Sequence, residues 1–234
     1  MMSNKAYTDL LALLGIGGAH PGGLELTKTI LLKENLLDKK LLEIGCGTGQ
    51  TSLFLHAMNL DITPVDNHPI MIEKANNRFA EHQAGITALQ MDIEKTELED
   101  CTYDFILSES VLSFTDTNKT LPELYRLLKE DGVLLAFEMT KKDTMHIELG
   151  DRMKQFYNMP EIFSKNDWKE AFEQHGFKKV EISPFSLGDL EPSEPEIQPS
   201  EVIEDMYFEV MHEHEKLTYE SQEYIELSII RAQR

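Results

Sequence analysis

The sequence predicts an α/β fold in which helices cover both faces of a doubly wound, mostly parallel sheet. Short apolar runs alternate along the chain with segments of helical periodicity, the pattern that β-α-β units produce. One run, residues 133–139, is apolar at all but one position, as expected of a strand covered on both faces. A third observation is the glycine-rich turn at residues 45–49, which separates an apolar run from a helical segment. Such a turn is typical of the first strand-to-helix connection in a ligand-binding sheet.

In chain order, helices are predicted where apolar side chains recur every three or four residues, and strands where short apolar runs end in turn-forming residues. Pro69 suits a first helical turn, and Ser164 suits a helix N-cap. Pro64 removes one backbone donor and predicts a short or bulged strand. The predicted helices are residues 5–14, 23–36, 51–58, 67–83, 117–129, 143–157, 164–176 and 200–216. The predicted strands are residues 41–44, 60–66, 86–93, 103–112, 133–139, 178–182 and 224–231.

Length and composition indicate an ordinary globular protein. The chain has 234 residues, of which 41% are hydrophobic and 27% charged, enough for one domain with a sizeable core. The two cysteines, Cys46 and Cys101, indicate no disulfide framework and favour a reducing, cytoplasmic location. No apolar run approaches the roughly 20 residues of a membrane span, and we expect neither a signal peptide nor a membrane partner.

The net charge of −20 argues against a protein that grips nucleic acid through its phosphates, since such proteins present a basic face. Residues 187–226 concentrate this charge, with thirteen acidic residues and one lysine. One interpretation is a solvated loop followed by an amphipathic helix. The other is an insertion that shapes an active-site rim, with a cationic or amine substrate. The sequence His212-Glu213-His214 lacks the spacing of a metal site, so no metal is expected.

The turn Gly45-Cys46-Gly47-Thr48-Gly49 can bring backbone close to a ligand, because glycine has no Cβ and adopts positive φ. The free N–H groups of the following helix would then face that ligand. A nucleotide-like cofactor is the natural occupant. The third glycine comes one residue too early for the Gly-x-Gly-x-x-Gly fingerprint of dinucleotide-binding proteins, which argues against a dinucleotide cofactor. No Gly-Lys-Ser/Thr follows, which excludes the Walker phosphate-binding motif.

Two acidic residues stand at predicted strand ends. Asp66 lies about twenty residues past the glycine turn, where a carboxylate can accept both ribose hydroxyls. It could instead cap the next helix, a role open also to Asn67 or His68. Asp92 stands at the end of the predicted strand at residues 86–93.

Residues 43–49 read Glu-Ile-Gly-Cys-Gly-Thr-Gly and resemble motif I of the class I S-adenosylmethionine-dependent methyltransferases. Asp66, Asp92 and the strand at residues 103–112 follow in the order that this family shows. The resemblance is close over residues 38–140 and loose elsewhere. It implies a Rossmann-like sheet of seven strands with an antiparallel last strand at residues 224–231. It further implies a small-molecule enzyme of the ubiquinone/menaquinone-methyltransferase-like type.

The resemblance implies S-adenosyl-L-methionine as cofactor, with S-adenosyl-L-homocysteine as product. Asp92 would accept from the adenine amino group, the backbone N–H of Ile93 would serve a ring nitrogen, and Ser108 would lie near the methionine part. The candidate cofactor-binding residues are Glu43, Gly45, Cys46, Gly47, Gly49, Asp66, Asn67, Asp92, Ile93 and Ser108. The candidates for positioning the methyl acceptor are His20 and Glu109, with Tyr157 a more distant possibility.

The expected organisation is a single methyltransferase domain over residues 1–234. A cap at about residues 1–37 contains a glycine-rich linker suited to a lid, and the cofactor-binding core spans about residues 38–140. Substrate-side helices or insertions lie at about residues 141–164 and 187–217, with candidate pocket walls at Met153, Phe156, Tyr157 and Met159.

The predicted reaction is in-line methyl transfer to a small molecule, in which the protein mainly aligns the reactants and excludes water. A tRNA or protein methyltransferase would instead show a basic patch beside the cofactor cleft. The Asn/Asp-Pro-Pro-Tyr/Phe signature of amino-group methylation is absent, since Ser108-Glu109-Ser110-Val111 stands in its place. A non-catalytic S-adenosylmethionine-binding module would show a cleft blocked over the sulfonium, and an NAD dehydrogenase remains only if the turn spacing misleads. We expect a monomer or a homodimer.

Overall fold

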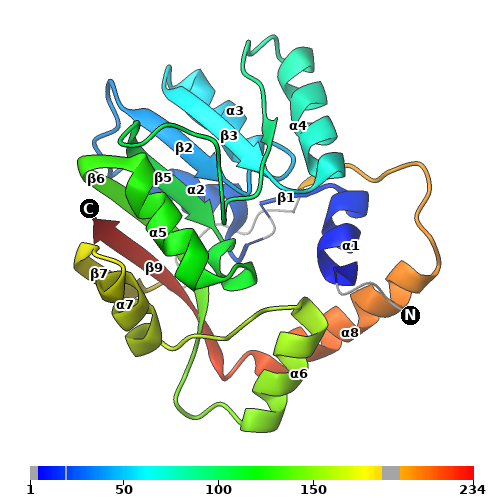
Figure 1. The fold of residues 1–234 in the computed structure, drawn as a ribbon. Coiled ribbons are helices and arrows are strands. Elements are labelled where there is room, and N and C mark those ends of the chain that lie inside the picture. Colours follow the sequence, from blue (N-terminus) through cyan, green and yellow to red (C-terminus); the bar gives the residue numbers. More distant parts are fainter. Residues whose placement is uncertain (1–4, 19, 186–195) are drawn as a thin grey trace.

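The computed structural model describes residues 5–18, 20–185 and 196–234, and it contains a seven-stranded sheet flanked by helices (Figure 1). The strand order is β4-β3-β2-β5-β6-β9-β7, and β9 runs antiparallel to both of its neighbours. The predicted fold class is therefore confirmed, including the antiparallel last strand. The strands of this sheet are β2 (Lys40–Ile44), β3 (Asp61–Asp66), β4 (Leu89–Gln90), β5 (Tyr103–Glu109), β6 (Leu128–Lys141), β7 (Lys178–Pro184) and β9 (Ile225–Gln233).

Helices cover both faces of the sheet, and two apolar clusters lie beneath them. Leu42 points into a cluster that contains side chains of α5 and α7, whereas Leu41 points into one that contains side chains of α2 and α3. This alternation is what a strand buried on both faces requires. The helices are α1 (Ala6–Leu14), α2 (Gly23–Leu31), α3 (Gln50–Ala57), α4 (Pro69–Glu81), η1 (Leu112–Phe114), α5 (Thr117–Leu127), α6 (Ile147–Tyr157), α7 (Lys165–Gln174) and α8 (Met206–Ser221).

Several predicted boundaries are wrong. The strand expected at residues 86–93 is only β4, because the side chain of Asn76 pairs with both backbone groups of Ala88 (2.9 and 3.2 Å) in place of a neighbouring strand. Residues 130–132, expected to separate a helix from a strand, lie within β6 where the register with β5 shifts. Pro64 causes neither shortening nor a bulge, since β3 pairs with β2 in continuous register.

The remaining differences concern helix ends. The helix expected at residues 23–36 ends at Leu31, and the one expected at residues 143–157 begins at Ile147. The helix expected at residues 200–216 is α8, which begins and ends five or six residues later. Most of the expected acidic loop at residues 188–200 lies outside the described residues. Ser164 does form a capping box with Asp167 at the start of α7.

Three helices far apart in sequence pack together beyond the sheet, where Figure 1 shows α1, α6 and α8 as neighbours. Leu10 of α1 packs with Val210 of α8, and Met153 of α6 packs with Leu217 of α8. A second, two-stranded sheet joins β1 (Ile16–Gly17) to β8 (Glu196–Ile197). Described residues from both ends of the chain thus pack together on this side of the sheet.

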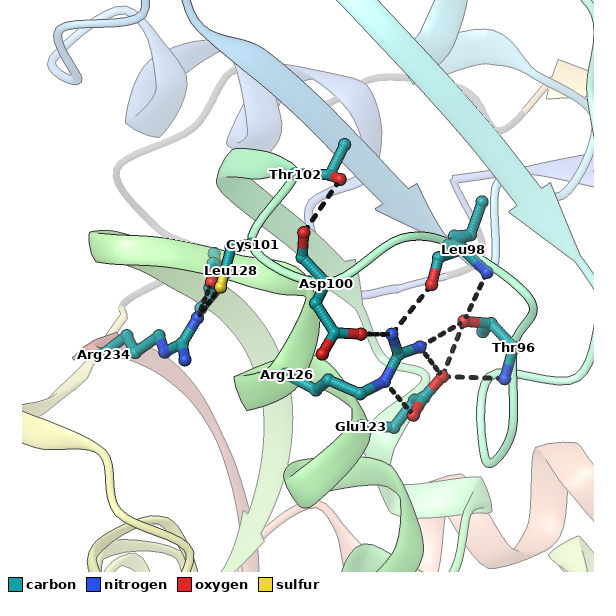
Figure 2. A network of polar contacts seen from close by, with 9 residues as sticks. All are labelled: Thr96, Leu98, Asp100, Cys101, Thr102, Glu123, Arg126, Leu128 and Arg234. Atoms are coloured by element: carbon teal, nitrogen blue, oxygen red, sulfur yellow. Dashed lines mark hydrogen bonds and ion pairs between the residues drawn. The ribbon is translucent and has the colours of Figure 1, made fainter.

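The acidic connection at residues 94–102 is anchored by Arg126 of α5 (Figure 2). The Arg126 guanidinium donates to the Leu98 carbonyl (2.8 Å), and it pairs with Asp100 and with Glu123 (2.6 Å). Burial alone would raise the pKa of Glu123, but the hydrogen bonds from Arg126 and Thr96 lower it to about 2. This network fixes the loop that follows Asp92.

Among the helices formed by the described residues, none is long and apolar enough to cross a bilayer.

Candidate active site

The glycine turn joins β2 to α3, and all three of its glycines have positive φ, between 53° and 76°. A Cβ on Gly45 would lie 2.3 Å from Val111 Cγ2, and one on Gly49 would lie 2.6 Å from the ring of Phe79. Around Gly47, in contrast, nothing lies within 4 Å of the Cβ position. Gly45 and Gly49 therefore let the turn pack tightly, while Gly47 leaves room on the side that faces the cavity.

Asp66 stands at the end of β3 and holds the glycine turn against the start of α4. Its carboxylate accepts from the backbone N–H of Gly47 (2.9 Å) and from that of His68 (2.8 Å). Burial raises the pKa of Asp66, although these two N–H groups act in the opposite direction. His68 provides the side-chain cap, accepting from the N–H of Ile70 (3.3 Å). A carboxylate has about four acceptor positions, so Asp66 retains capacity for further donors.

A cavity of about 1370 Å³ opens beside the glycine turn. Most of the predicted site residues line it, and these are Gly45, Cys46, Gly47, Asp66, Asn67, Asp92, Ile93, Glu109 and His20.

Three predicted cofactor-binding residues, Glu43, Gly49 and Ser108, do not line the cavity. Glu43 is buried, and its carboxyl group is hydrogen-bonded to the hydroxyl of Ser52 (2.6 Å). Burial and the nearby charge of Glu109 raise its pKa well above the ordinary value. Gly49 lies at the N-cap of α3, and the fully buried Ser108 hydroxyl donates to Glu138. These residues support the cavity wall from behind.

His20 and Glu109 form a buried ion pair, with His20 Nε2 lying 3.1 Å from Glu109 Oε1. The hydroxyl of Thr27 also donates to Glu109. Burial alone would lower the pKa of His20 and raise that of Glu109, but their pairing reverses both shifts. His20 is only 6% exposed, so it is not a solvated loop histidine. The pair ties the glycine-rich linker to the end of β5.

The His20–Glu109 pair predicts a pH-dependent stability difference between the wild-type protein and the variant His20→Gln. The His20 pKa is raised, so its contribution is complete below the unfolded value of 6.5 and is lost as pH rises through the folded value. The Glu109 pKa is lowered, so its contribution is lost as pH falls below the unfolded value of 4.5. In His20→Gln we expect the free energy of unfolding to be lower by about 3 kcal/mol between pH 4.5 and pH 6.5. The difference from the wild-type protein should become smaller at lower and at higher pH. Urea unfolding across this pH range measures it, and a difference that is constant with pH would contradict it.

The second sheet and its anchors form a strap over the glycine turn, made of β1, β8 and Gln198. Arg78 of α4 donates its Nε to the Thr48 carbonyl (2.7 Å) and its Nη2 to Glu196 Oε1 (2.5 Å). Glu196 Oε2 accepts from the side chain of Gln50 at 2.7 Å. Lys74 donates to the carbonyl of Gln198 at 2.6 Å. A small number of polar contacts therefore hold the strap on the glycine turn, and Ile16 of the strap lines the cavity.

Weakening the strap should speed release of a ligand held beneath it. In Glu196→Gln the ion pair with Arg78 is lost, and we expect dissociation to accelerate about five- to tenfold, corresponding to about 1 kcal/mol for one partly exposed charged contact. Stopped-flow displacement of bound S-adenosylhomocysteine measures this rate. The control is Glu201→Gln, an exposed residue near the strap. Equal rates for the wild-type protein and Glu196→Gln would show that the strap does not gate exchange.

The far half of the cavity, which we call the acceptor half, is formed mostly by aromatic, methionine and aliphatic side chains. Tyr7 of α1 is stacked with Phe114 and in edge contact with Tyr157, with ring centroids 6.3 and 4.8 Å apart. Of the predicted pocket walls, Met153, Tyr157 and Met159 line the cavity, whereas Phe156 packs behind Tyr7. The other residues of this half include Met139, His214, Thr218, Ser221, Gln222, Ile225 and Leu227.

Glu138 is a buried carboxyl that the sequence reasoning missed as a site residue. It is fully buried on β6 and accepts from the N–H groups of Val111, Leu112 and Ser113 (2.9–3.2 Å) and from the Ser113 hydroxyl (2.6 Å). Burial raises its pKa to about 7, against the effect of these donors. Its position within an otherwise apolar strand was the available signal. Glu138 shapes the loop after β5, which lines the cavity.

The strand order, the glycine turn and the acidic strand ends around one cavity define a class of fold, the Rossmann-like α/β sheet that methyltransferases share. A family model described as "Methyltransferase domain" matches residues 42–136. The "Uncharacterized methyltransferase YodH" of Bacillus subtilis is 35% identical over 222 residues, which are 94% of this chain and 95% of that protein. The chain therefore belongs to the methyltransferase family, and it is a class I S-adenosylmethionine-dependent methyltransferase.

Other relatives are more distant. A malonyl-[acyl-carrier protein] O-methyltransferase of Paenibacillus is 32% identical over 67% of this chain and 62% of that protein. The solved phosphoethanolamine N-methyltransferase 2 of Haemonchus contortus, in complex with S-adenosyl-L-methionine, superposes with a TM-score of 0.72 at 17% identity. That superposition covers 99% of this chain and 56% of the other. The [4+2]-cyclase SpnF superposes equally well at 18% identity, over 98% and 93% of the two chains. These solved structures share the fold.

Proposed function

We propose that this methyltransferase acts on a small-molecule acceptor that enters the acceptor half of the cavity. The observation that carries the proposal is that a single cavity is lined both by the glycine turn with Asp66 and by Tyr157. Its volume of about 1370 Å³ exceeds the roughly 300–1,000 Å³ usual for one ligand. A cofactor and an acceptor can therefore lie side by side.

The cofactor fits the residues present at one end of this cavity. The side of Gly47 that would carry a Cβ is open, so the backbone there can approach a ligand. Asp66 would hold the ribose hydroxyls, and Asp92 with the N–H of Ile93 would hold the adenine edge. S-adenosylmethionine supplies an electrophilic methyl group when bound. The protein's part is to align the acceptor with that methyl group and to exclude water.

The charge of the lining favours a small molecule over a nucleic acid. Lys5 is the one lysine among the described residues of the lining, which include no arginine. The acidic residues there are Asp9, Asp66, Asp92, Glu94, Glu109, Asp116 and Glu226. This is the opposite of the basic patch that a tRNA methyltransferase would present. An open acceptor half likewise disfavours a binding module without catalysis. We therefore expect a metabolite acceptor, no nucleic-acid or membrane partner, and a cytoplasmic location.

Incubation of the purified protein with donor labelled on its methyl group and a cytoplasmic metabolite pool tests the proposal. We expect the label to appear in one or a few small molecules. Label that appears only in tRNA or protein would contradict the small-molecule acceptor. An absence of any labelled product, under conditions where S-adenosylhomocysteine binds, would favour the non-catalytic alternative.

A further inference from the structure

We propose that His214 is the general base of the reaction, that Tyr157 positions it, and that the acceptor enters as an uncharged compound bearing a hydroxyl group. This inference rests on the proposed function, because it assigns a proton acceptor and an acceptor chemistry to the same cavity. His214 lies on α8, Tyr157 on α6, and both line the acceptor half.

Three carboxylates of the cavity lining, those of Glu109, Asp116 and Glu226, are already paired and have little free capacity to accept a proton. Glu109 is paired with His20 and also receives the Thr27 hydroxyl. Asp116 lies 3.3 Å from the Lys119 ammonium, and Glu226 lies 2.7 Å from that of Lys165. Their charge is compensated by the protein itself. This pairing argues against a cationic or amine substrate, which was the second interpretation of the acidic segment at residues 187–226.

An anionic acceptor is no better matched. Carboxylates and phosphates are normally held by the planar fork of arginine, and the described lining has none. The solved geranyl diphosphate C-methyltransferase complexes contain Mg²⁺ as well as a diphosphate compound. In the part of this chain that the structure describes, no group of three or more His, Cys, Asp or Glu is arranged to hold a metal ion. An uncharged acceptor fits the aromatic and methionine walls.

The imidazole ring of His214 is fixed in place by contacts with two tyrosines. Its Nδ1 lies 3.0 Å from the Tyr157 hydroxyl, and its ring lies against that of Tyr7, with centroids 5.0 Å apart. When Nδ1–H donates to Tyr157 Oη, Nε2 carries the lone pair. Burial lowers the pKa of His214, an effect that Glu215 on the same helix opposes. The other titratable groups facing the ring are Tyr7 from α1 and Tyr157 from α6, whose pKa values burial raises, so both stay uncharged at neutral pH.

The acceptor oxygen would form a bond to the methyl carbon of S-adenosylmethionine as the bond between that carbon and sulfur breaks. The electron pair of the broken bond would remain on sulfur, which gives S-adenosylhomocysteine. The hydroxyl proton moves to Nε2 of His214, and it leaves to water after product release. A neutral imidazole is suited to this role, because general-base catalysis requires an unprotonated group near the operating pH.

The test has two parts, of which the first measures His214 without turnover. In protein loaded with S-adenosylhomocysteine, nuclear magnetic resonance of isotope-labelled imidazoles follows His214, assigned by its loss in His214→Gln. We expect phenol to shift this resonance, and benzoate and benzylammonium to bind at least about tenfold more weakly. In Tyr157→Phe the Nδ1 partner is lost, so we expect the tautomer to change. Preference for either charged probe, or no response to phenol, would overturn the acceptor class.

The second part uses the acceptor found with the labelled donor. We expect His214→Gln to lower kcat/KM by about 100- to 10,000-fold and to abolish the rise of kcat/KM with pH, with S-adenosylhomocysteine binding unchanged. The control is His212→Gln, at an exposed position on the same helix. It should keep the wild-type kcat/KM and its rise with pH. If His214→Gln keeps the wild-type pH profile, the general base is refuted while the proposed function stands. If the wild-type protein binds no S-adenosylhomocysteine or labels no small molecule, the proposed function itself is refuted, and the general base with it.

Discussion

Asp66→Ala is expected to weaken the binding of S-adenosylhomocysteine by about a hundredfold or more. A hydrogen bond to a charged group contributes about 1.5–3 kcal/mol, and the proposed role gives Asp66 two ribose hydroxyls. The same change removes the acceptor of the Gly47 and His68 N–H groups, so the glycine turn also loses its anchor. Isothermal titration calorimetry measures the effect.

The control for this variant is Asp61→Ala. Asp61 is exposed and lies at the opposite end of the same strand, so its removal should leave the affinity within a factor of about two. Asp66→Asn removes the charge of the side chain but keeps its shape. We expect its affinity for S-adenosylhomocysteine to lie between those of Asp66→Ala and the wild-type protein. Wild-type affinity in Asp66→Ala would place the ribose elsewhere in the cavity.

Glu138→Leu is expected to lower the free energy of unfolding by about 5 kcal/mol or more, because each buried donor left without an acceptor costs about 1–3 kcal/mol. Three backbone N–H groups and the hydroxyls of Ser108 and Ser113 would lose their partner. The loop after β5 lines the cavity, so the affinity for S-adenosylhomocysteine should fall as well. Denaturant unfolding and calorimetry measure the two effects.

Two further variants make the Glu138 prediction specific. Glu138→Gln keeps one acceptor oxygen and should lose less stability than Glu138→Leu. Glu130→Leu changes an exposed residue of the same strand and should stay within about 0.5 kcal/mol of the wild-type protein. If Glu138→Leu were as stable as Glu130→Leu, the buried carboxyl would have no structural role.

Much of the fold could be predicted because its signals are local. The glycine turn and the acids at strand ends are features of short segments, and parallel strands bring their carboxyl ends to one edge. Asp66, Asp92 and Gly47 consequently line one cavity, as the sequence indicated.

The features that the sequence did not reveal depend on long-range contacts. The pairing of β1 with β8 joins segments about 180 residues apart, and no local pattern specifies it. His20 meets Glu109, and Tyr157 meets His214, only after the helices have packed. The strand at β4 is short because a side chain of α4 replaces its backbone partner, which periodicity cannot report.

A crystal structure of the complex with S-adenosylhomocysteine tests the central claim most directly. We predict the adenosyl group in the cavity beside Gly47, with its ribose hydroxyls on Asp66, its adenine at Asp92 and its sulfur facing the acceptor half. A ligand bound elsewhere, or one whose ribose does not meet Asp66, would contradict the account.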